Sequence, residues 1–131
     1  MIALDTKVLV RFLVSDDAVQ SKKAKEFIEK NIRKDTRLFL SDIVLVEAFW
    51  VLNRSYGFSK EDIVRVFRML IAARNLEFES TDRTARALRS YETGRADFSD
   101  YVIHEIAVEN GCNAVATFDK KLLKEKGFVK P

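Results

Sequence analysis

The stretch Ala114-Val115-Ala116-Thr117-Phe118, followed directly by Asp119, is the clearest strand signal in the sequence. Its short apolar run of small, β-branched and aromatic residues is typical of a β-strand. The segment before it, from Asp97 to Asn110, predicts a helix, and Gly111 is a suitable residue to end that helix. A helix that leads into a strand indicates one unit of an alternating α/β fold.

The same alternation continues outward along the whole chain. Further strands are expected at Ile2–Leu4, Leu38–Leu40, Leu76–Phe78 and, shorter, Phe128–Val129. The other helices are expected at Lys7–Val14, Asp17–Arg33, Ser41–Tyr56, Ser59–Arg74, Thr81 or Asp82 to Tyr91, and Lys120–Lys126. Strands separated by helices imply βαβ crossovers. We therefore expect one domain over residues 1–131, a three-layer α/β/α fold with a mostly parallel, roughly five-stranded sheet.

Composition excludes several classes of protein. The 131 residues are 47% hydrophobic and 33% charged, which is typical of a globular domain and not of a disordered chain. One cysteine, Cys112, and one histidine, His104, cannot build a structural zinc site or an intramolecular disulfide. They lie at opposite ends of one expected helix, which makes a cysteine protease pair a weak alternative. This cysteine usage favours a reducing compartment.

Charge and the N-terminus point to a cytoplasmic protein with no membrane partner. Asp5, Lys7 and Arg11 interrupt the first apolar stretch, which a signal-peptide core would not tolerate. No apolar run approaches the ~18 residues of a membrane-spanning helix. The net charge of +3 permits nucleic-acid binding without demanding it.

Five acidic residues stand out by position. Asp5 and Asp119 each follow a strand, and ligands of parallel α/β sheets bind at the carboxyl ends of strands. Asp97 and Asp100 would share one face at the start of a helix. For these four, helix capping is the competing interpretation, since an acidic side chain also stabilises a helix N-terminus.

Glu47 is the fifth. Its helical neighbours at three and four residues, Ile43, Val44, Trp50 and Val51, are all apolar, which predicts a buried carboxylate. A buried charge requires a partner, and Arg54 or a metal ion are the candidates. His104, one turn beyond Asp100, is expected to be an ordinary surface or core side chain.

Together the carboxylates indicate a cation site. Converged acidic side chains would repel one another, and no clustered lysines neutralise them. Oxygen-only ligands favour Mg²⁺ or Mn²⁺ over Zn²⁺. Such ions, held by carboxylates, activate water and stabilise the leaving oxygen in phosphodiester cleavage. The residues therefore predict metal-dependent phosphotransfer or hydrolysis, without naming the substrate.

Four segments of the chain, in this order, resemble a PIN domain, specifically the VapC type of toxin ribonuclease. They are residues 2–10 (IALDTKVLV), 41–47 (SDIVLVE), 96–103 (ADFSDYVI) and 116–122 (ATFDKKL). They are similar, respectively, to the family's first strand ending in Asp-Thr or Asp-Ser, the helix with its single Glu, its Asp-Phe-x-Asp segment, and its Thr-x-Asp strand end. Each is short, but their order over nearly the whole chain is specific.

The resemblance implies a role for each matched residue. Asp5, Glu47, Asp100 and Asp119 match the metal-site carboxylates, and Asp97 matches a frequent additional acid. Thr6 and Thr117 match small hydroxyl residues that support the site. Two residues depart from the family pattern: Lys7 stands where Asn is frequent, and Tyr101 where a small residue is usual. Neither removes a carboxylate, but both could alter the groove.

The resemblance also implies RNA cleavage with Mg²⁺ or Mn²⁺, a homodimer and a VapB-type antitoxin. Candidates to hold the RNA backbone, with solvated surface charge as the alternative for each, are Arg11, Arg54, Arg65, Arg68 and Arg95.

Other functions fit less well. A PIN nuclease of RNA processing or decay keeps the chemistry without the toxin role, whereas a non-catalytic PIN scaffold conflicts with the presence of all four acids. A phospho-acceptor receiver domain needs an acidic pair after strand one and an acceptor Asp after a middle strand; residues 76–80 (LEFES) supply none. A haloacid-dehalogenase-like phosphatase needs a second Asp where Lys7 stands.

Overall fold

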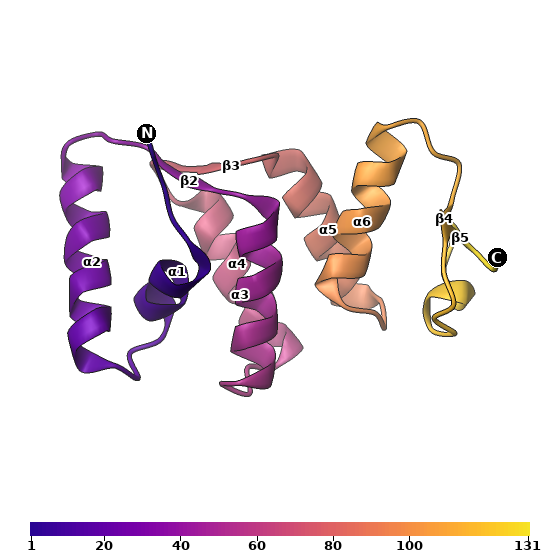
Figure 1. Cartoon of the computed structure of the whole chain (residues 1–131), viewed down its shortest axis with the longest axis horizontal. Coiled ribbons are helices and arrows are strands. Elements are labelled where there is room, and N and C mark those ends of the chain that lie inside the picture. Colours follow the sequence, from indigo (N-terminus) through magenta and orange to yellow (C-terminus); the bar gives the residue numbers. More distant parts are fainter. The chain divides into compact units, whose positions relative to one another are not determined.

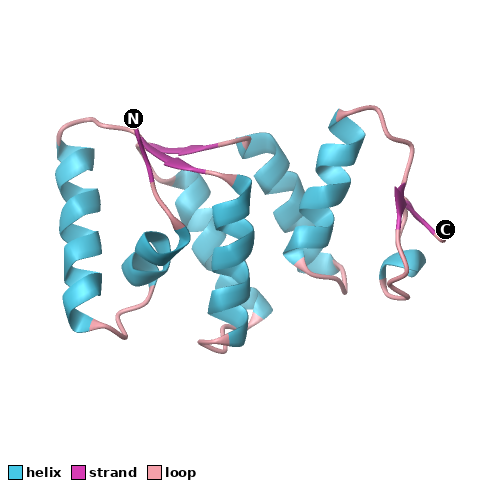
Figure 2. Cartoon of the chain, viewed as in Figure 1, coloured by secondary structure: helices cyan, strands magenta, loops and turns pink.

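The computed structural model describes all residues from 1 to 131, as two compact units, Met1–Thr81 and Asp82–Pro131. Figure 1 traces their elements, and Figure 2 distinguishes helices from strands. Unit 1 contains β1 (Ile2–Ala3), α1 (Thr6–Leu13), α2 (Ala18–Arg33), β2 (Leu38–Leu40), α3 (Asp42–Arg54), α4 (Lys60–Ala72) and β3 (Leu76–Phe78). From α5 (Thr81–Thr93) onward, the chain forms α6 (Phe98–Glu109), β4 (Val115–Ala116), the 3₁₀ helix η1 (Leu122–Lys124) and β5 (Phe128–Val129).

Unit 1 is built on a parallel three-stranded sheet in the order β1-β2-β3. Leu38 pairs with Ile2 on one side and Leu76 on the other, so β2 is the central strand. Leu38 and Leu40, which share one face of the sheet, are fully buried, and Phe39, on the other face, is half-buried. Helix α1 packs against both α2 and α3, as Figure 1 shows.

Local capping explains where the helices of unit 1 begin. The side chain of Asp17 accepts the Gln20 N–H at 2.9 Å to start α2. Ser59 and Asp62 form a capping box at the start of α4. Gly57, with φ of 65°, takes the left-handed conformation after α3, which favours glycine.

Unit 2 consists of α5 and α6 and a parallel two-stranded sheet, β4 with β5. Its core includes Leu88, Phe98 and Leu122. Three ion pairs join the helices: Arg83 to Glu109 at 2.7 Å, Arg86 to Glu105 at 3.0 Å and Arg86 to Glu109 at 3.4 Å.

The structure confirms the α/β class, the order of the elements and the parallel strands. The strands form a three-stranded and a two-stranded sheet, one in each unit. Most boundaries differ from the expected ones by one or two residues. The clearest differences are in unit 2: the strand expected at 114–118 is Val115–Ala116, and the helix expected at 120–126 is the single 3₁₀ turn Leu122–Lys124. Both elements lie in a short segment, which leaves few residues to lengthen the strand or the helix. No helix is both long and apolar enough to cross a membrane.

Candidate active site

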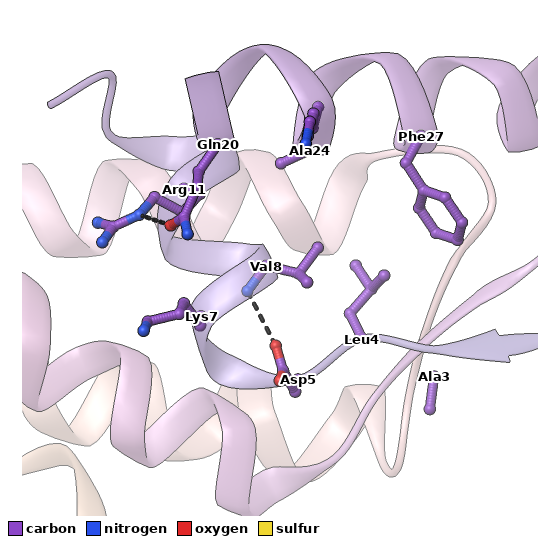
Figure 3. A pocket seen from close by; sticks show the side chains of 10 residues that line it. Ala3, Leu4, Asp5, Lys7, Val8, Arg11, Gln20, Ala24 and Phe27 are labelled. Carbon is purple, nitrogen blue, oxygen red and sulfur yellow. Dashed lines mark hydrogen bonds between the residues drawn. The ribbon is translucent and has the colours of Figure 1, made fainter. Parts of the chain in front are cut away.

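Asp5 follows β1 and is the N-cap of α1. Its backbone is extended, and its Oδ1 accepts the Val8 N–H at 2.9 Å, as Figure 3 shows. The capping interpretation of Asp5 is therefore correct as a description of this hydrogen bond. The bond uses one carboxylate oxygen of an exposed side chain, so it leaves the other oxygen for a ligand. Thr6 is the first residue of α1 and is half-buried.

An open pocket of about 470 Å³ lies beside Asp5, between α1 and α2. Its apolar wall comes from residues such as Leu4, Val8, Ala24 and Phe27, which Figure 3 shows as sticks. The charged side chains that line it are Asp5, Lys7, Arg11 and Lys23.

Arg11, a candidate RNA contact, is held in a hydrogen-bonded network within unit 1. Its guanidinium donates to Gln20 at 2.7 Å, to Asp16 at 3.1 Å and to the Tyr56 hydroxyl oxygen at 3.0 Å. The Tyr56 hydroxyl in turn donates to Asp16 at 2.6 Å. The hydrogen bond with Tyr56 raises the pKa of Arg11. This network joins the start of α2 to the end of α3.

Glu47 corrects the expectation of a buried carboxylate: its side chain is exposed. Helix α3 buries a single stripe that includes Leu45, Ala48, Phe49 and Leu52. Two of the apolar neighbours that suggested burial, Ile43 and Trp50, are themselves exposed. An apolar neighbour along the helix thus did not imply an apolar environment, because the helix packs through one face only. Because the Glu47 carboxylate is exposed to water, it does not need a charged partner, and the structure shows none.

The remaining arginine candidates differ in their surroundings. Arg54 does not pair with Glu47; its guanidinium lies 5.5 Å from the centre of the Trp50 ring. Arg65 pairs with Asp62 at 2.6 Å. Arg68 is exposed on α4, and Arg95 is exposed in the loop before α6. Of these four arginines, Arg95 is the one close in sequence to candidate metal ligands, since it lies two residues before Asp97.

Two further acidic residues of unit 1 also follow strands. Asp42 is buried at the start of α3, just after β2, and its N–H donates to Glu79 Oε1 at 3.1 Å. Glu79 follows β3. Both stand after strands that the sequence predicted, so the rule that singled out Asp5 and Asp119 would also have identified them.

In unit 2, Asp97 and Asp100 lie at the start of α6. Asp97 is the N-cap residue, and its N–H donates to Asp100 Oδ2 at 3.1 Å. Asp100 is thus the third residue of the helix and folds back on the cap. As with Asp5, one carboxylate oxygen of Asp100 is fixed by a backbone N–H.

Asp119 follows β4, and it is exposed. Its Oδ1 accepts the Lys121 N–H at 2.8 Å, and its own N–H donates to the Thr117 hydroxyl oxygen at 3.0 Å. Thr117 therefore supports the turn that carries Asp119, consistent with the supporting role that the resemblance implied. His104 stacks on Phe128, with ring centres 5.2 Å apart, as an ordinary partly buried side chain does.

The acidic residues of unit 2 influence one another. Partial burial raises the pKa of Asp100, and the negative charges of Asp97, Asp119 and Glu125 raise it further, against a lowering by the backbone hydrogen bond at Asp97. Carboxylates this close disfavour the ionised form. A cation among them would relieve that repulsion, so the donor set suits a hard divalent ion.

Each unit carries part of the predicted metal site. Asp5 and Glu47 belong to unit 1, and Asp97, Asp100 and Asp119 belong to unit 2. Within neither unit do three acidic, histidine or cysteine side chains come together in a metal-binding group. The four-carboxylate site stays a prediction.

Comparison with known proteins identifies the family. The chain is 27% identical over 125 residues to a VapC ribonuclease of Aquifex aeolicus (strain VF5), covering 95% of this chain and 91% of that protein. It also resembles the crystal structure of VapC20 of Mycobacterium tuberculosis, described as a toxin that cleaves the sarcin-ricin loop, with 20% identity, full coverage of both chains and a TM-score of 0.46. A likeness of that degree carries no argument about activity. The family model of the PIN domain matches residues 2–128, and the chain therefore belongs to the PIN-domain family.

Proposed function

We propose that this protein is a Mg²⁺- or Mn²⁺-dependent endoribonuclease. Its metal site would use Asp5, Glu47, Asp100 and Asp119, with Asp97 as an additional acid. Membership of the PIN-domain family and similarity to a VapC ribonuclease support the reaction class. The observation that carries the metal is the chemistry of the donors: Asp5, Asp100 and Asp119 each keep one carboxylate oxygen outside the printed hydrogen bond to a backbone N–H, and such hard oxygen donors suit Mg²⁺ or Mn²⁺.

The chain's own residues prepare the ligands. Asp5, Asp100 and Asp119 each accept one backbone N–H with one carboxylate oxygen, at 2.9, 3.1 and 2.8 Å. A carboxylate fixed in this way loses less rotational freedom when it binds an ion. Bound Mg²⁺ or Mn²⁺ supplies the Lewis acidity that activates water and stabilises the leaving oxygen of a phosphodiester. Glu47, exposed and unpaired, remains available to the same site.

RNA binding would rest on exposed basic side chains. Arg95 is the first candidate, because it is exposed two residues before Asp97. Arg11 is a weaker candidate, since its guanidinium is already shared among Gln20, Asp16 and Tyr56. Neutralising Arg95 is expected to weaken RNA binding similarly for all sequences, because a phosphate contact carries no base information.

We further propose a toxin role: a cytoplasmic homodimer, neutralised by a VapB-type antitoxin. Support comes from the VapC ribonuclease relative and from a single exposed cysteine, Cys112, which suits a reducing compartment. A PIN nuclease of RNA processing is the alternative. Production of the wild type in a host cell is expected to stop growth, and co-production of a small DNA-binding protein from a neighbouring gene should restore it. Normal growth, with active enzyme present, would favour the alternative.

The nuclease proposal is tested by metal dependence. Purified protein is incubated with several structured RNAs, because a selective nuclease can be inactive on an arbitrary one. Cleavage is expected to require Mg²⁺ or Mn²⁺, to stop in chelator and to return when the metal is restored. Asp119→Asn should lose cleavage while keeping its fold. Cleavage that persists in chelator would rule out the mechanism.

A further inference from the structure

Two consecutive backbone amides before α6 are bound by two side chains that also bind each other. The Arg95 N–H donates to Glu125 Oε1 at 3.4 Å. The Ala96 N–H donates to the Tyr101 hydroxyl oxygen at 3.3 Å. The Tyr101 hydroxyl then donates to Glu125 Oε1 at a short 2.7 Å. The next amide, that of Asp97, is the one bound by Asp100, so every N–H from 95 to 97 is engaged.

This arrangement is closely packed. Tyr101 is only 5% exposed. A side chain at Gly94 would collide with the Tyr101 hydroxyl and with Glu125 Oε1, so the close approach of this backbone requires glycine. The second oxygen, Glu125 Oε2, is buried without a hydrogen-bond partner. Leaving a buried carboxylate oxygen unpaired is unfavourable, so this geometry is not the one that stability alone would select.

Glu125 also connects this loop to the segment that carries Asp119. Leu123 N–H donates to the Asp119 carbonyl at 3.1 Å, and Glu125 N–H donates to the Leu122 carbonyl at 2.9 Å. These turns tie Glu125 to Asp119 through a short, hydrogen-bonded stretch. The hydrogen bond from Tyr101 to Glu125 therefore spans the two pieces of chain that present the acidic residues of unit 2.

We infer that Tyr101 and Glu125 are positioning residues, which set the separation between the start of α6, with Asp97 and Asp100, and Asp119. This inference rests on the proposed function, since that separation matters only if these carboxylates share a metal ion. Tyr101 is also one of the two positions at which the sequence departs from the family pattern. Supporting groups of this kind alter metal affinity by about 10- to 100-fold when they are lost.

The test separates positioning from stability. In the double variant Tyr101→Phe, Glu125→Leu, both partners become apolar groups of similar shape and Glu125 Oε2 disappears, but the Arg95 and Ala96 amides lose their acceptors. The metal-free fold should therefore be moderately less stable than the wild type, and the comparison is made with a variant of similar stability. Mn²⁺ affinity, measured by calorimetry, is expected to fall about tenfold or more. Hydrogen exchange at the Arg95 and Ala96 amides should accelerate, and kcat for RNA should fall with KM unchanged.

Two variants serve as controls. Glu125→Gln removes the charge but keeps an oxygen that can accept both bonds, so it should bind Mn²⁺ nearly as the wild type does. Ser59→Ala removes the capping hydroxyl of α4 and controls for general destabilisation. If Tyr101→Phe fails to fold, the double variant and Glu125→Gln still give the comparison.

Each outcome is decisive. Wild-type Mn²⁺ affinity and kcat in both the double variant and Tyr101→Phe would overturn the inference and leave the nuclease proposal standing. Equal losses of Mn²⁺ affinity and kcat in Glu125→Gln and in the double variant would show that metal binding depends on the charge of Glu125 and not on its hydrogen bond. That result would also overturn the inference. A wild type that neither binds Mn²⁺ nor cleaves RNA would remove the proposed function and this inference together.

Discussion

One oxygen of Asp5 caps helix α1, and the proposed function gives its other oxygen to a metal ion. The two uses can be separated, because an amide oxygen caps a helix about as well as a carboxylate does. In Asp5→Asn, the cap bond from Val8 should survive while the negative charge is lost. In the proposed function, it is metal binding that depends on this charge.

We therefore expect Asp5→Asn to leave the metal-free melting temperature unchanged or slightly raised, since the substitution removes a negative charge from the site. The stabilisation that excess Mg²⁺ gives the wild type by binding the native state should disappear. Asp5→Ala is the matched control and should lose about 1 kcal/mol of stability with its cap. A marked drop in the melting temperature of Asp5→Asn would show that Asp5 is chiefly structural.

Local position was predictable from sequence, whereas packing was not. Asp5 and Asp119 follow strands and Asp97 begins a helix, as the sequence indicated, while their role as metal ligands stays a prediction. The exposure of Glu47 could not be predicted, because the apolar neighbours along α3 do not say which face of the helix packs. The Tyr101–Glu125 hydrogen bond joins residues 24 positions apart, and no local sequence pattern predicts it.

At the scale of elements, the network of Arg11, Asp16 and Tyr56 joins α1, the start of α2 and the end of α3. The hydrogen bond from Tyr56, and then the charge of Arg11, lower the pKa of Asp16 in the folded protein. A carboxyl whose pKa is lowered by folding stabilises the fold above its ordinary pKa of 3.8. That contribution is lost as pH falls through the lowered value.

The difference in melting temperature between the wild type and Asp16→Asn should accordingly be largest at neutral pH and vanish in acid. Its size should be modest, because the groups are partly exposed. Asp17→Asn is a suitable control, since an amide oxygen can keep the cap bond to Gln20. The same difference in melting temperature between the wild type and Asp16→Asn at every pH would contradict the stabilising role of the ionised carboxylate.

Helix boundaries were predictable because caps are local. Ser41, Ser59 and Asp17, the residues at which the sequence indicated helix starts, each accept a hydrogen bond from an amide three residues ahead. Strand lengths in unit 2 were not predictable, since a strand extends only as far as it pairs with its neighbour. Two residues of β4 pair with two residues of β5. Pairing is set by tertiary structure, which a single-sequence pattern does not contain.

For the whole molecule, the order of elements followed from the alternation of strand and helix patterns, and the family from four short segments spread from residue 2 to residue 122. Asp5 and Glu47 lie in unit 1, and Asp97, Asp100 and Asp119 lie in unit 2. The central claim is that these acidic residues act as one metal-holding group. Groups that act as a unit show non-additive effects, because losing any one member already disables the whole.

The most direct measurement compares single-turnover RNA cleavage by the wild type, Asp5→Asn, Asp119→Asn and the double variant, at saturating Mn²⁺. We predict that each single substitution lowers the rate by more than about 100-fold. The double variant should be scarcely slower than either single one. A double variant whose rate is lowered by the product of the two single effects would contradict the claim of one shared site. A single variant with nearly full activity would contradict it as well.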